Sequence, residues 1–295
     1  MTIPRLGYFL LVSLLWSLPT FAESLCASDA RDRQVCLDTP AGRIVSLSPG
    51  ATELLFSAGA GNDVIAVSAW SDYPPAAENL PQVGDSNRLD LEAIVSLEPD
   101  LVVAWTDGNS APQLERIEAL GIPVFWLEPR TFDDIAHAVE QLALLTGHDS
   151  VGSQRADRFR AQMAQLEQHY ADAEPISVFY QVWHQPLMTI NDQELIGRVI
   201  NLCGGQNVFG DLTRLVPRIS TEAVLQANPS VVITGGKDQN DQRWLDEWRQ
   251  FPELSAVQAD NLFLVSPSLI QRPTLRMYDG AVEFCQVLER ARGQL

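Results

Sequence analysis

The sequence predicts an α/β protein with two Rossmann-like lobes that are joined by a single long, rigid helix. Apolar strands alternate with helices of about ten residues in both halves, which is typical of βα units in a mainly parallel sheet. Segments 90–103 (DLEAIVSLEPDLVV) and 220–233 (STEAVLQANPSVVI) align without a gap, which indicates two lobes of like architecture. Residues 150–174 contain no proline and carry apolar side chains at helical spacing, so one stiff helix is expected between the lobes.

The amino terminus has the layout of a secretory signal peptide over residues 1–22. A basic residue precedes an apolar run from Gly7 to Leu18, and small residues follow. The run is shorter than the roughly 18 to 20 residues that a membrane-spanning helix needs. We therefore expect an exported, soluble protein whose mature chain starts near Glu23.

Length and charge limit the remaining possibilities. The mature chain of about 270 residues is long enough for two compact domains. The formal net charge is −18, and we expect no nucleic-acid partner because such a partner requires a basic surface. The acidity itself favours solubility. The expected units are an extension over 23–42, a first lobe over 43–148, the connecting helix over 149–174 and a second lobe over 175–295.

The first lobe shows clear helix boundaries between its strands. Ser48 supplies a hydroxyl cap and Pro49 fits the first helical position, so a helix is predicted directly after the first strand. Thr131 and Asp134 predict a capping-box start for a later helix that ends at Gly147. The expected strands lie at 43–48, 64–67, 100–105 and 123–128.

The chain has four cysteines, and an even number in an exported protein favours disulfides over metal binding. Three pairings are open on paper. Local pairing within each half is the economical choice, and it joins Cys26 to Cys36 and Cys203 to Cys285.

Motifs of enzymes are missing from the sequence. None of the four histidines stands in a metal-ligand spacing, and the serine-nucleophile, phosphate-loop and dinucleotide-binding motifs are absent. We expect no catalytic residues, no catalytic cofactor and no metal centre. A cell-envelope enzyme or assembly factor that uses the same lobes is the alternative.

Three tryptophans stand where a ligand would bind. Trp70 follows an apolar strand, Trp105 and Trp183 each end one, and ligands of parallel α/β sheets bind at the carboxyl ends of the strands. Aromatic rings there suit a planar or macrocyclic ligand. The alternative is that a ring caps the core of its own lobe. Packing is the expected role of the remaining mature tryptophans, Trp126, Trp244 and Trp248.

Five segments carry a resemblance to a known family: RIVSLSPGATELLFSAGAG, SDYPP, LEAIVSLEPDLVVAW, NLCGGQNVF and EAVLQANPSVVITGG. With them the sequence resembles the periplasmic cobalamin-binding proteins of vitamin import systems, within the helical-backbone (class III) substrate-binding proteins. The likeness runs from Arg43 to about Arg290. The strand motifs alone would also fit binders of ferric siderophores or haem.

The resemblance implies a monomeric periplasmic protein that captures cobalamin or another corrinoid as transported ligand. It also implies delivery to the permease dimer of an ABC importer. Carried over by position, Trp70 stacks against the corrin, Trp105 lines the pocket and Arg272 faces the ligand. Cys203 and Cys285 match the disulfide of that family.

The sequence departs from the family at three pocket positions, where Ser86 and Val216 replace aromatic residues and Ser268 replaces an acid. We expect Trp183 to supply aromatic surface from the other lobe. A siderophore pocket usually needs several basic residues to hold an anionic chelate. The sequence offers three arginines for this role, Arg272, Arg276 and Arg88.

Glu92 and Glu222 occupy the second position of equivalent helices in the repeat. A carboxylate in a first helical turn gains about 0.3 to 1 kcal/mol from the helix dipole, which is a sufficient local explanation. The resemblance implies a further role, because matching glutamates of that family pair with arginines on the two permease subunits.

Overall fold

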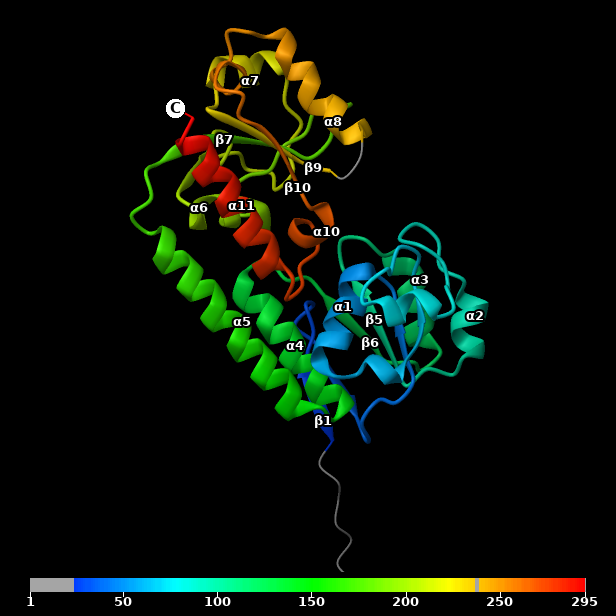
Figure 1. The fold of residues 1–295 in the computed structure, drawn as a ribbon. Coiled ribbons are helices and arrows are strands. Elements are labelled where there is room, and N and C mark those ends of the chain that lie inside the picture. The colour runs from blue at the N-terminus through cyan, green and yellow to red at the C-terminus, as the bar shows by residue number, and fades with distance from the viewer. Residues whose placement is uncertain (1–23, 237–238, 295) are drawn as a thin grey trace, which may run out of the picture.

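The computed structural model describes residues 24–236 and 239–294, and the expected signal peptide over 1–22 lies outside them. Two α/β lobes lie at the two ends of a long helix (Figure 1). The predicted fold class is confirmed. Within the described part of the chain, no helix has the length and apolar character needed to cross a membrane.

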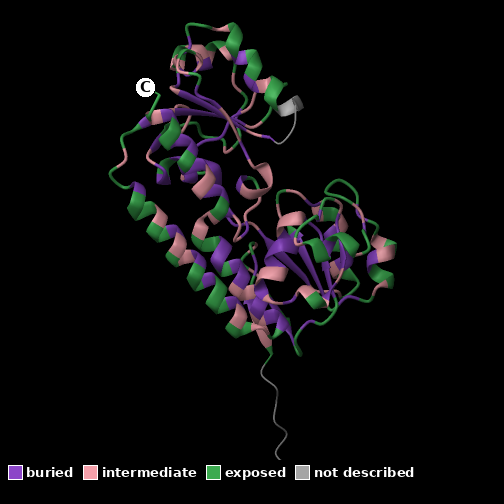
Figure 2. Cartoon of the chain, in the orientation of Figure 1, coloured by how far each residue is buried: buried purple, intermediate pink, exposed green. Residues whose placement is uncertain are grey.

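The first lobe is a parallel sheet with helices on both faces. Its strands are β3 (Ile44–Ser46), β4 (Val64–Val67), β5 (Leu101–Trp105) and β6 (Val124–Leu127). Its helices and 3-10 turns are α1 (Pro49–Ala58), η1 (Gly61–Asp63), η2 (Pro75–Asn79), α2 (Leu91–Ser96), α3 (Ala111–Ala119) and α4 (Phe132–Thr146). The strand order is β4-β3-β5-β6, and alternate residues of β5 enter two different cores. Both faces of the sheet are therefore buried (Figure 2).

The predicted helix starts of this lobe are confirmed. The Ser48 hydroxyl accepts a hydrogen bond from the backbone N–H of Ala51, and Pro49 opens α1. Thr131 and Asp134 form the complete capping box of α4. These caps satisfy N–H groups that a helix leaves without partners at its start.

The second lobe repeats the same sheet. Its strands are β7 (Ile176–Gln181), β8 (Gly205–Asn207), β9 (Val231–Gly235) and β10 (Leu262–Val265). Its helices are α6 (Leu195–Leu202), α7 (Thr221–Ala227), α8 (Gln239–Asp246), η3 (Glu247–Gln250), α9 (Ser255–Gln258), α10 (Pro267–Ile270) and α11 (Met277–Arg292). The strand order is β10-β9-β7-β8. Counted along each lobe, both sheets have the order 2-1-3-4 or its reverse, so the repeat in the sequence is a repeat of topology.

Helix α5 (Asp149–Tyr170) connects the lobes. Its Arg160 binds both carboxylate oxygens of Glu140 in α4, at 2.6 and 2.9 Å, and Arg155 donates to carbonyl groups at the end of α1. One continuous core extends from the first lobe along α5 into the second. The helix ends at Tyr170, four residues before the expected boundary at 174.

Two disulfides hold the ends of the chain. Cys26 and Cys36 pair within a hairpin of β1 (Leu25–Ser28) and β2 (Gln34–Leu37), in the segment expected to be only an extension. Cys203 at the end of α6 pairs with Cys285 in α11. The pairing within each half is therefore the pairing found in the structure.

Candidate functional site

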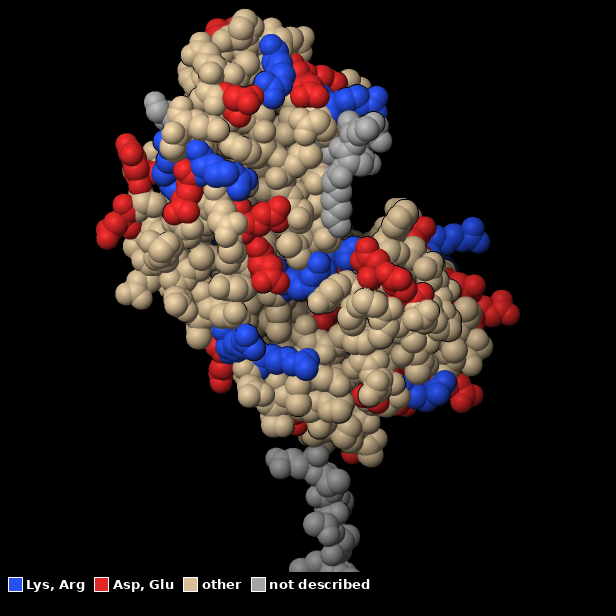
Figure 3. Space-filling view, in the orientation of Figure 1, with Lys and Arg blue, Asp and Glu red and all other residues tan. Residues whose placement is uncertain are grey.

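A cavity of ≈160 Å³ lies where the two lobes meet. The amino-terminal turn of α1 and the carboxyl ends of β5 and β6 form one side, and residues 271–273 of the second lobe form the other. Figure 3 shows the surface hollowed between the lobes on this face. The cavity lies where the sheet order reverses between β3 and β5, which is the usual ligand position in such sheets.

Trp105 lines this cavity and is 39% exposed. Its ring lies against Gly108, where any Cβ would collide with the ring. Asn109 fixes the backbone, because its Oδ1 accepts from the Trp105 N–H at 2.8 Å and its Nδ2 donates to the Leu47 carbonyl at 2.9 Å. The sequence analysis missed this asparagine, and a polar residue four positions after a strand-end aromatic is a weak signal.

Trp70 lies outside the cavity lining, in the loop that follows β4, and is 79% exposed. Its φ of 67° is in the left-handed region, which costs a residue other than glycine about 1–3 kcal/mol and persists only where the surroundings fix it. The next residue, Ser71, has its Oγ 3.1 Å from the Oγ1 of Thr52 in α1. The backbone is thus held while the indole remains open to a ligand.

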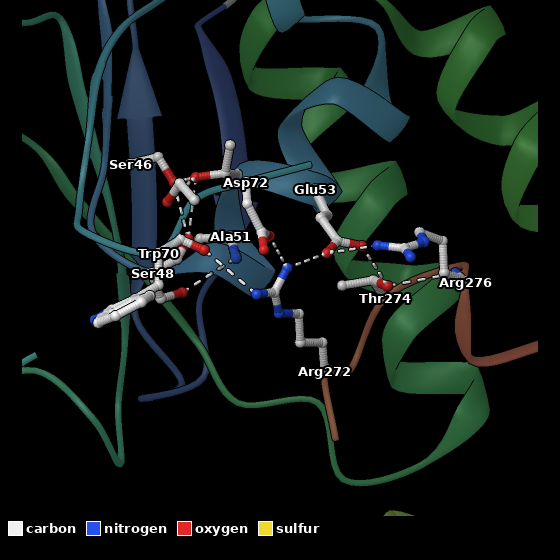
Figure 4. Close-up of polar contacts among 11 residues, drawn as sticks. Ser46, Ser48, Ala51, Glu53, Trp70, Asp72, Arg272, Thr274 and Arg276 are labelled. Carbon is white, nitrogen blue, oxygen red and sulfur yellow. Dashed lines mark hydrogen bonds and ion pairs between the residues drawn. The ribbon is translucent and has the colours of Figure 1, made fainter. Parts of the chain in front are cut away.

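Arg272 lines the cavity, but its guanidinium is directed at two carboxylates of the first lobe (Figure 4). Nη1 lies 2.9 Å from Oε1 of Glu53 and 2.6 Å from Oδ1 of Asp72, and Nη2 donates to the Trp70 carbonyl at 3.3 Å. Burial would lower the pKa of Arg272, but the hydrogen bonds and charges of Asp72 and Glu53 raise it above its ordinary value. The guanidinium is therefore charged and is held by three acceptors of the first lobe.

Glu53 is the centre of this network and is only 2% exposed. Besides Arg272 it binds Arg276, whose Nη1 lies 3.2 Å from Oε1, and it accepts a hydrogen bond from the Thr274 hydroxyl at 3.0 Å. A buried carboxylate is stable only with such partners. A glutamate inside the apolar helix sequence ATELLFSA could have indicated a buried ionic site, and the sequence analysis did not use it.

Trp183 is not among the residues that line the cavity. It is 52% exposed, its indole N–H donates to the Gln185 carbonyl, and its ring packs edge-on against Trp244 with centroids 5.4 Å apart. The His184 ring stacks on the same Trp244 ring, with centroids 5.9 Å apart. All of these contacts are within the second lobe.

Packing is confirmed for two of the three tryptophans for which it was predicted. Trp126 and Trp248 are buried, and each indole N–H finds an acceptor, on Glu118 and Gln181 respectively. Trp244 is half-buried beneath Trp183.

Glu92 and Glu222 are exposed in the first turns of α2 and α7. The helix caps are equivalent, with the Asp90 carboxylate and the Ser220 hydroxyl each accepting a backbone N–H. Hydrogen bonds from its own N–H and from Ser220 hold the pKa of the Glu222 carboxyl below its ordinary value. A hollow of ≈480 Å³ beside Glu222 is also lined by Glu247 and Trp244.

Among the described residues, no group of three or more histidines, cysteines or carboxylates is arranged to hold a metal ion. The positions that depart from the family pattern are also outside the network. Ser86 lies in the turn before α2, Val216 is exposed, and Ser268 belongs to α10.

Known proteins resemble the whole chain. Residues 44–269 match the family model described as periplasmic binding protein. The vitamin B12-binding protein of Vibrio parahaemolyticus serotype O3:K6 is 34% identical over 275 residues, which cover 93% of this chain and 96% of the relative. That of Vibrio campbellii is 36% identical over 273 residues, covering 92% and 97%.

Solved structures agree with this match. The crystal structure of the periplasmic vitamin B12 binding protein BtuF of Vibrio cholerae has a TM-score of 0.79 at 36% identity, covering 86% of this chain and 98% of the other. The periplasmic heme-binding protein RhuT from Roseiflexus has a TM-score of 0.76 at 22% identity, covering 85% and 99%, and shares the fold. The chain therefore belongs to the periplasmic binding protein family.

Proposed function

We propose that the protein captures cobalamin or a related corrinoid between its lobes and delivers it to the permease of an ABC-type importer. Its family consists of substrate-binding proteins of the periplasm rather than enzymes, and relatives 34% and 36% identical are named vitamin B12-binding proteins. The observation that carries the proposal is the aromatic surface at the cleft, where Trp105 lines the cavity and Trp70 stands exposed beside Arg272.

The rings suit a large flat ligand. Exposed aromatic surface in a soluble protein commonly marks a binding site, and indole rings bury a wide area at low entropic cost. The cavity of ≈160 Å³ is smaller than the roughly 300–1,000 Å³ that encloses a drug-sized molecule. We therefore assign the cavity to a part of the ligand at the cleft floor and the macrocycle to the exposed rings.

The charges at the cleft favour a corrinoid over a ferric siderophore. Arg272 and Arg276 are both paired with Glu53, and Arg272 is also paired with Asp72. Two positive and two negative charges cancel, so this cluster offers no excess positive charge to an anionic chelate. Arg88, the third candidate for such a pocket, lies in an exposed turn.

A parallel titration tests the proposal. Purified protein is titrated with cobalamin, cobinamide, haem and a ferric siderophore, and the intrinsic tryptophan fluorescence is followed. We expect saturable, stoichiometric quenching by the corrinoids. Haem alone as an effective quencher, with no response to either corrinoid, would contradict the assignment.

We also propose that Glu92 and Glu222 dock the protein on the two halves of the permease. They are exposed at equivalent positions of the two lobes, which suits a two-fold symmetric partner. The hollow beside Glu222 adds the Glu247 carboxylate and the Trp244 ring, so this lobe presents a recess suited to a cationic side chain. Charge pairs of this kind mainly set orientation and association rate.

Export completes the proposed function. The protein acts as a monomer in the periplasm after a signal peptide over residues 1–22 is removed. A mass spectrum of the periplasmic protein should give a chain that starts near Glu23, and size-exclusion chromatography with light scattering should give the monomer mass. An uncleaved chain in the membrane fraction would contradict this route.

A further inference from the structure

We propose that Arg272 and Arg276 are positioning residues, which hold the Trp70 loop (residues 68–74) in place from the opposite lobe. The presentation of Trp70 then depends on how close the two lobes are. This inference rests on the proposed function for its ligand, but its structural part concerns the free protein.

The two arginines contact three groups of the loop. Arg272 donates to the Trp70 carbonyl at 3.3 Å and pairs with Asp72 at 2.6 Å. The guanidinium carbon of Arg276 lies 3.8 Å from the centre of the Tyr73 ring, a cation–π contact. Figure 4 shows the Trp70 ring directed away from both arginines, so they hold its backbone and leave the indole free.

The loop is divided between the lobes at Trp70. Its first part is bound by its own lobe, since the N–H groups of Ser68 and Ala69 donate to the carbonyls of Ser46 and Gly84. Beyond Trp70, the Ser71 hydroxyl contacts Thr52 of its own lobe, while Asp72 and Tyr73 lie against the arginines of the other lobe. The residue with the unfavourable left-handed φ therefore sits at the boundary between these two sets of contacts.

Glu53 fixes the arginines themselves. It accepts from Arg272, Arg276 and the Thr274 hydroxyl, and it belongs to α1, whose first turn lines the cavity. A buried carboxylate with three donors from one segment sets the register of that segment against α1. Separation of the lobes would pull residues 272–276 from Glu53 and from the loop together.

The consequence is a coupling between lobe position and binding surface. With the lobes close, the loop holds Trp70 in its strained conformation beside the cleft. With the lobes apart, the contacts of the Trp70 carbonyl, Asp72 and Tyr73 with the two arginines are lost, so the backbone at Trp70 is held less firmly and the ring loses its fixed place. A ligand that contacts Trp70 favours the close arrangement, and a partner that separates the lobes lowers the affinity by the same coupling.

Fluorine NMR of protein labelled with 5-fluorotryptophan tests the coupling without ligand, and Trp70→Phe identifies the Trp70 resonance. Arg272→Lys keeps a charge near Glu53 but cannot reach Asp72 and the Trp70 carbonyl together. Asp72→Asn removes a largely exposed partner and leaves the buried charges intact. Arg249→Lys is the matched control, because it weakens the exposed Arg249–Asp260 pair within the second lobe.

We expect Arg272→Lys and Asp72→Asn to shift or broaden the Trp70 resonance and to leave those of Trp126 and Trp248 unchanged. Cobalamin should then bind roughly 3- to 30-fold more weakly, through faster dissociation, whereas Arg249→Lys should match the unaltered protein. An unchanged Trp70 resonance in both variants would overturn the inference, whatever the ligand. Failure of the unaltered protein to bind any corrinoid would instead refute the proposed function, with the fluorine result still decisive for the loop.

Discussion

The first lobe meets the cleft with an open cavity, whereas the corresponding point of the second lobe is filled. Between β3 and β5, Trp105 lines empty space. Between β7 and β9, a Cβ at Gly235 would lie 2.7 Å from Nε2 of Gln271 and 3.0 Å from Oη of Tyr180, so these side chains occupy the position. Two sheets of the same topology thus present different surfaces to the cleft, and the side chains that follow their strands make the difference.

Docking should show the largest effect, and it requires both lobes. Glu92→Lys with Glu222→Lys should abolish transport, because both proposed charge pairs become repulsive. Ligand titration should remain normal. Uptake of labelled cobalamin by whole cells measures the effect, and the single reversals show whether the two lobes contribute equally.

The control for this experiment is a reversal of two exposed glutamates at other sites, Glu115→Lys with Glu253→Lys. It changes the net charge equally and should leave transport intact. Normal uptake by the Glu92 and Glu222 double variant, shown to be folded and ligand-bound, would contradict the docking proposal. Both glutamates would then serve only to stabilise the first turns of their helices.

Removing each of the two disulfides should lower the free energy of unfolding by a different amount. Replacing Cys203 and Cys285 by alanine opens a loop with a sequence separation of 82, for which chain entropy gives a loss of about 4.5 kcal/mol. The same change at Cys26 and Cys36, with a separation of 10, gives about 2.7 kcal/mol. Denaturant unfolding measures both free energies. Equal losses would mean that strain or denatured-state structure outweighs loop length.

The aromatic residues sharpen the comparison at the cleft. Trp105→Ala should weaken corrinoid binding by roughly 1–3 kcal/mol if the ring is a buried anchor in the complex. Trp183→Ala should cost less, because that ring packs on Trp244 and away from the cavity. Calorimetric titration gives both values. A larger loss of binding free energy for Trp183→Ala would show that the principal aromatic binding surface is on the second lobe.

Two glutamates with opposite pKa shifts give the smallest effect. Hydrogen bonds from Arg160 lower the pKa of Glu140 in the first lobe, whereas burial raises the pKa of Glu194 in the second. The Glu140 contribution is present above its unfolded pKa and is lost as the pH falls through the folded value. The Glu194 contribution is present below its unfolded pKa and is lost as the pH rises through the folded value.

Neutral substitutions should therefore have opposite signs at pH 7. Glu140→Gln should lower the free energy of unfolding by about 0.2–1 kcal/mol, and Glu194→Gln should raise it by up to about 1 kcal/mol. Urea unfolding between pH 4 and pH 8 checks both signs. Equal effects of one sign would show that hydrogen bonding to the neutral amide, rather than charge, controls these positions.

Local patterns were sufficient for the fold. The repeat at 90–103 and 220–233 and the caps at Ser48 and Thr131 depend on neighbours a few residues away, so they could be read directly. The hairpin around Cys26 was missed because each of its strands has only four residues, too few to show a clear alternating pattern.

The site was harder to predict, because its contacts are distant in the sequence. Arg272 binds Glu53 and Asp72, which precede it by 219 and 200 residues. No spacing rule connects such positions. The strand-end tryptophans could be identified one by one, but which of them line the cavity, as Trp105 does and Trp183 does not, depends on how the lobes face each other.

The contacts of α5 also bear on how the ligand leaves. Because Arg160 and Arg155 fasten this helix to the first lobe and a common core continues into the second, the free protein has few arrangements of its lobes to choose from. A binding protein whose lobes are already fixed loses little conformational entropy when it binds its ligand. Its affinity is higher for that reason, and the gain is expressed mainly as a lower dissociation rate. For the delivery proposed above, this means that the permease has to separate the lobes itself before the ligand can leave.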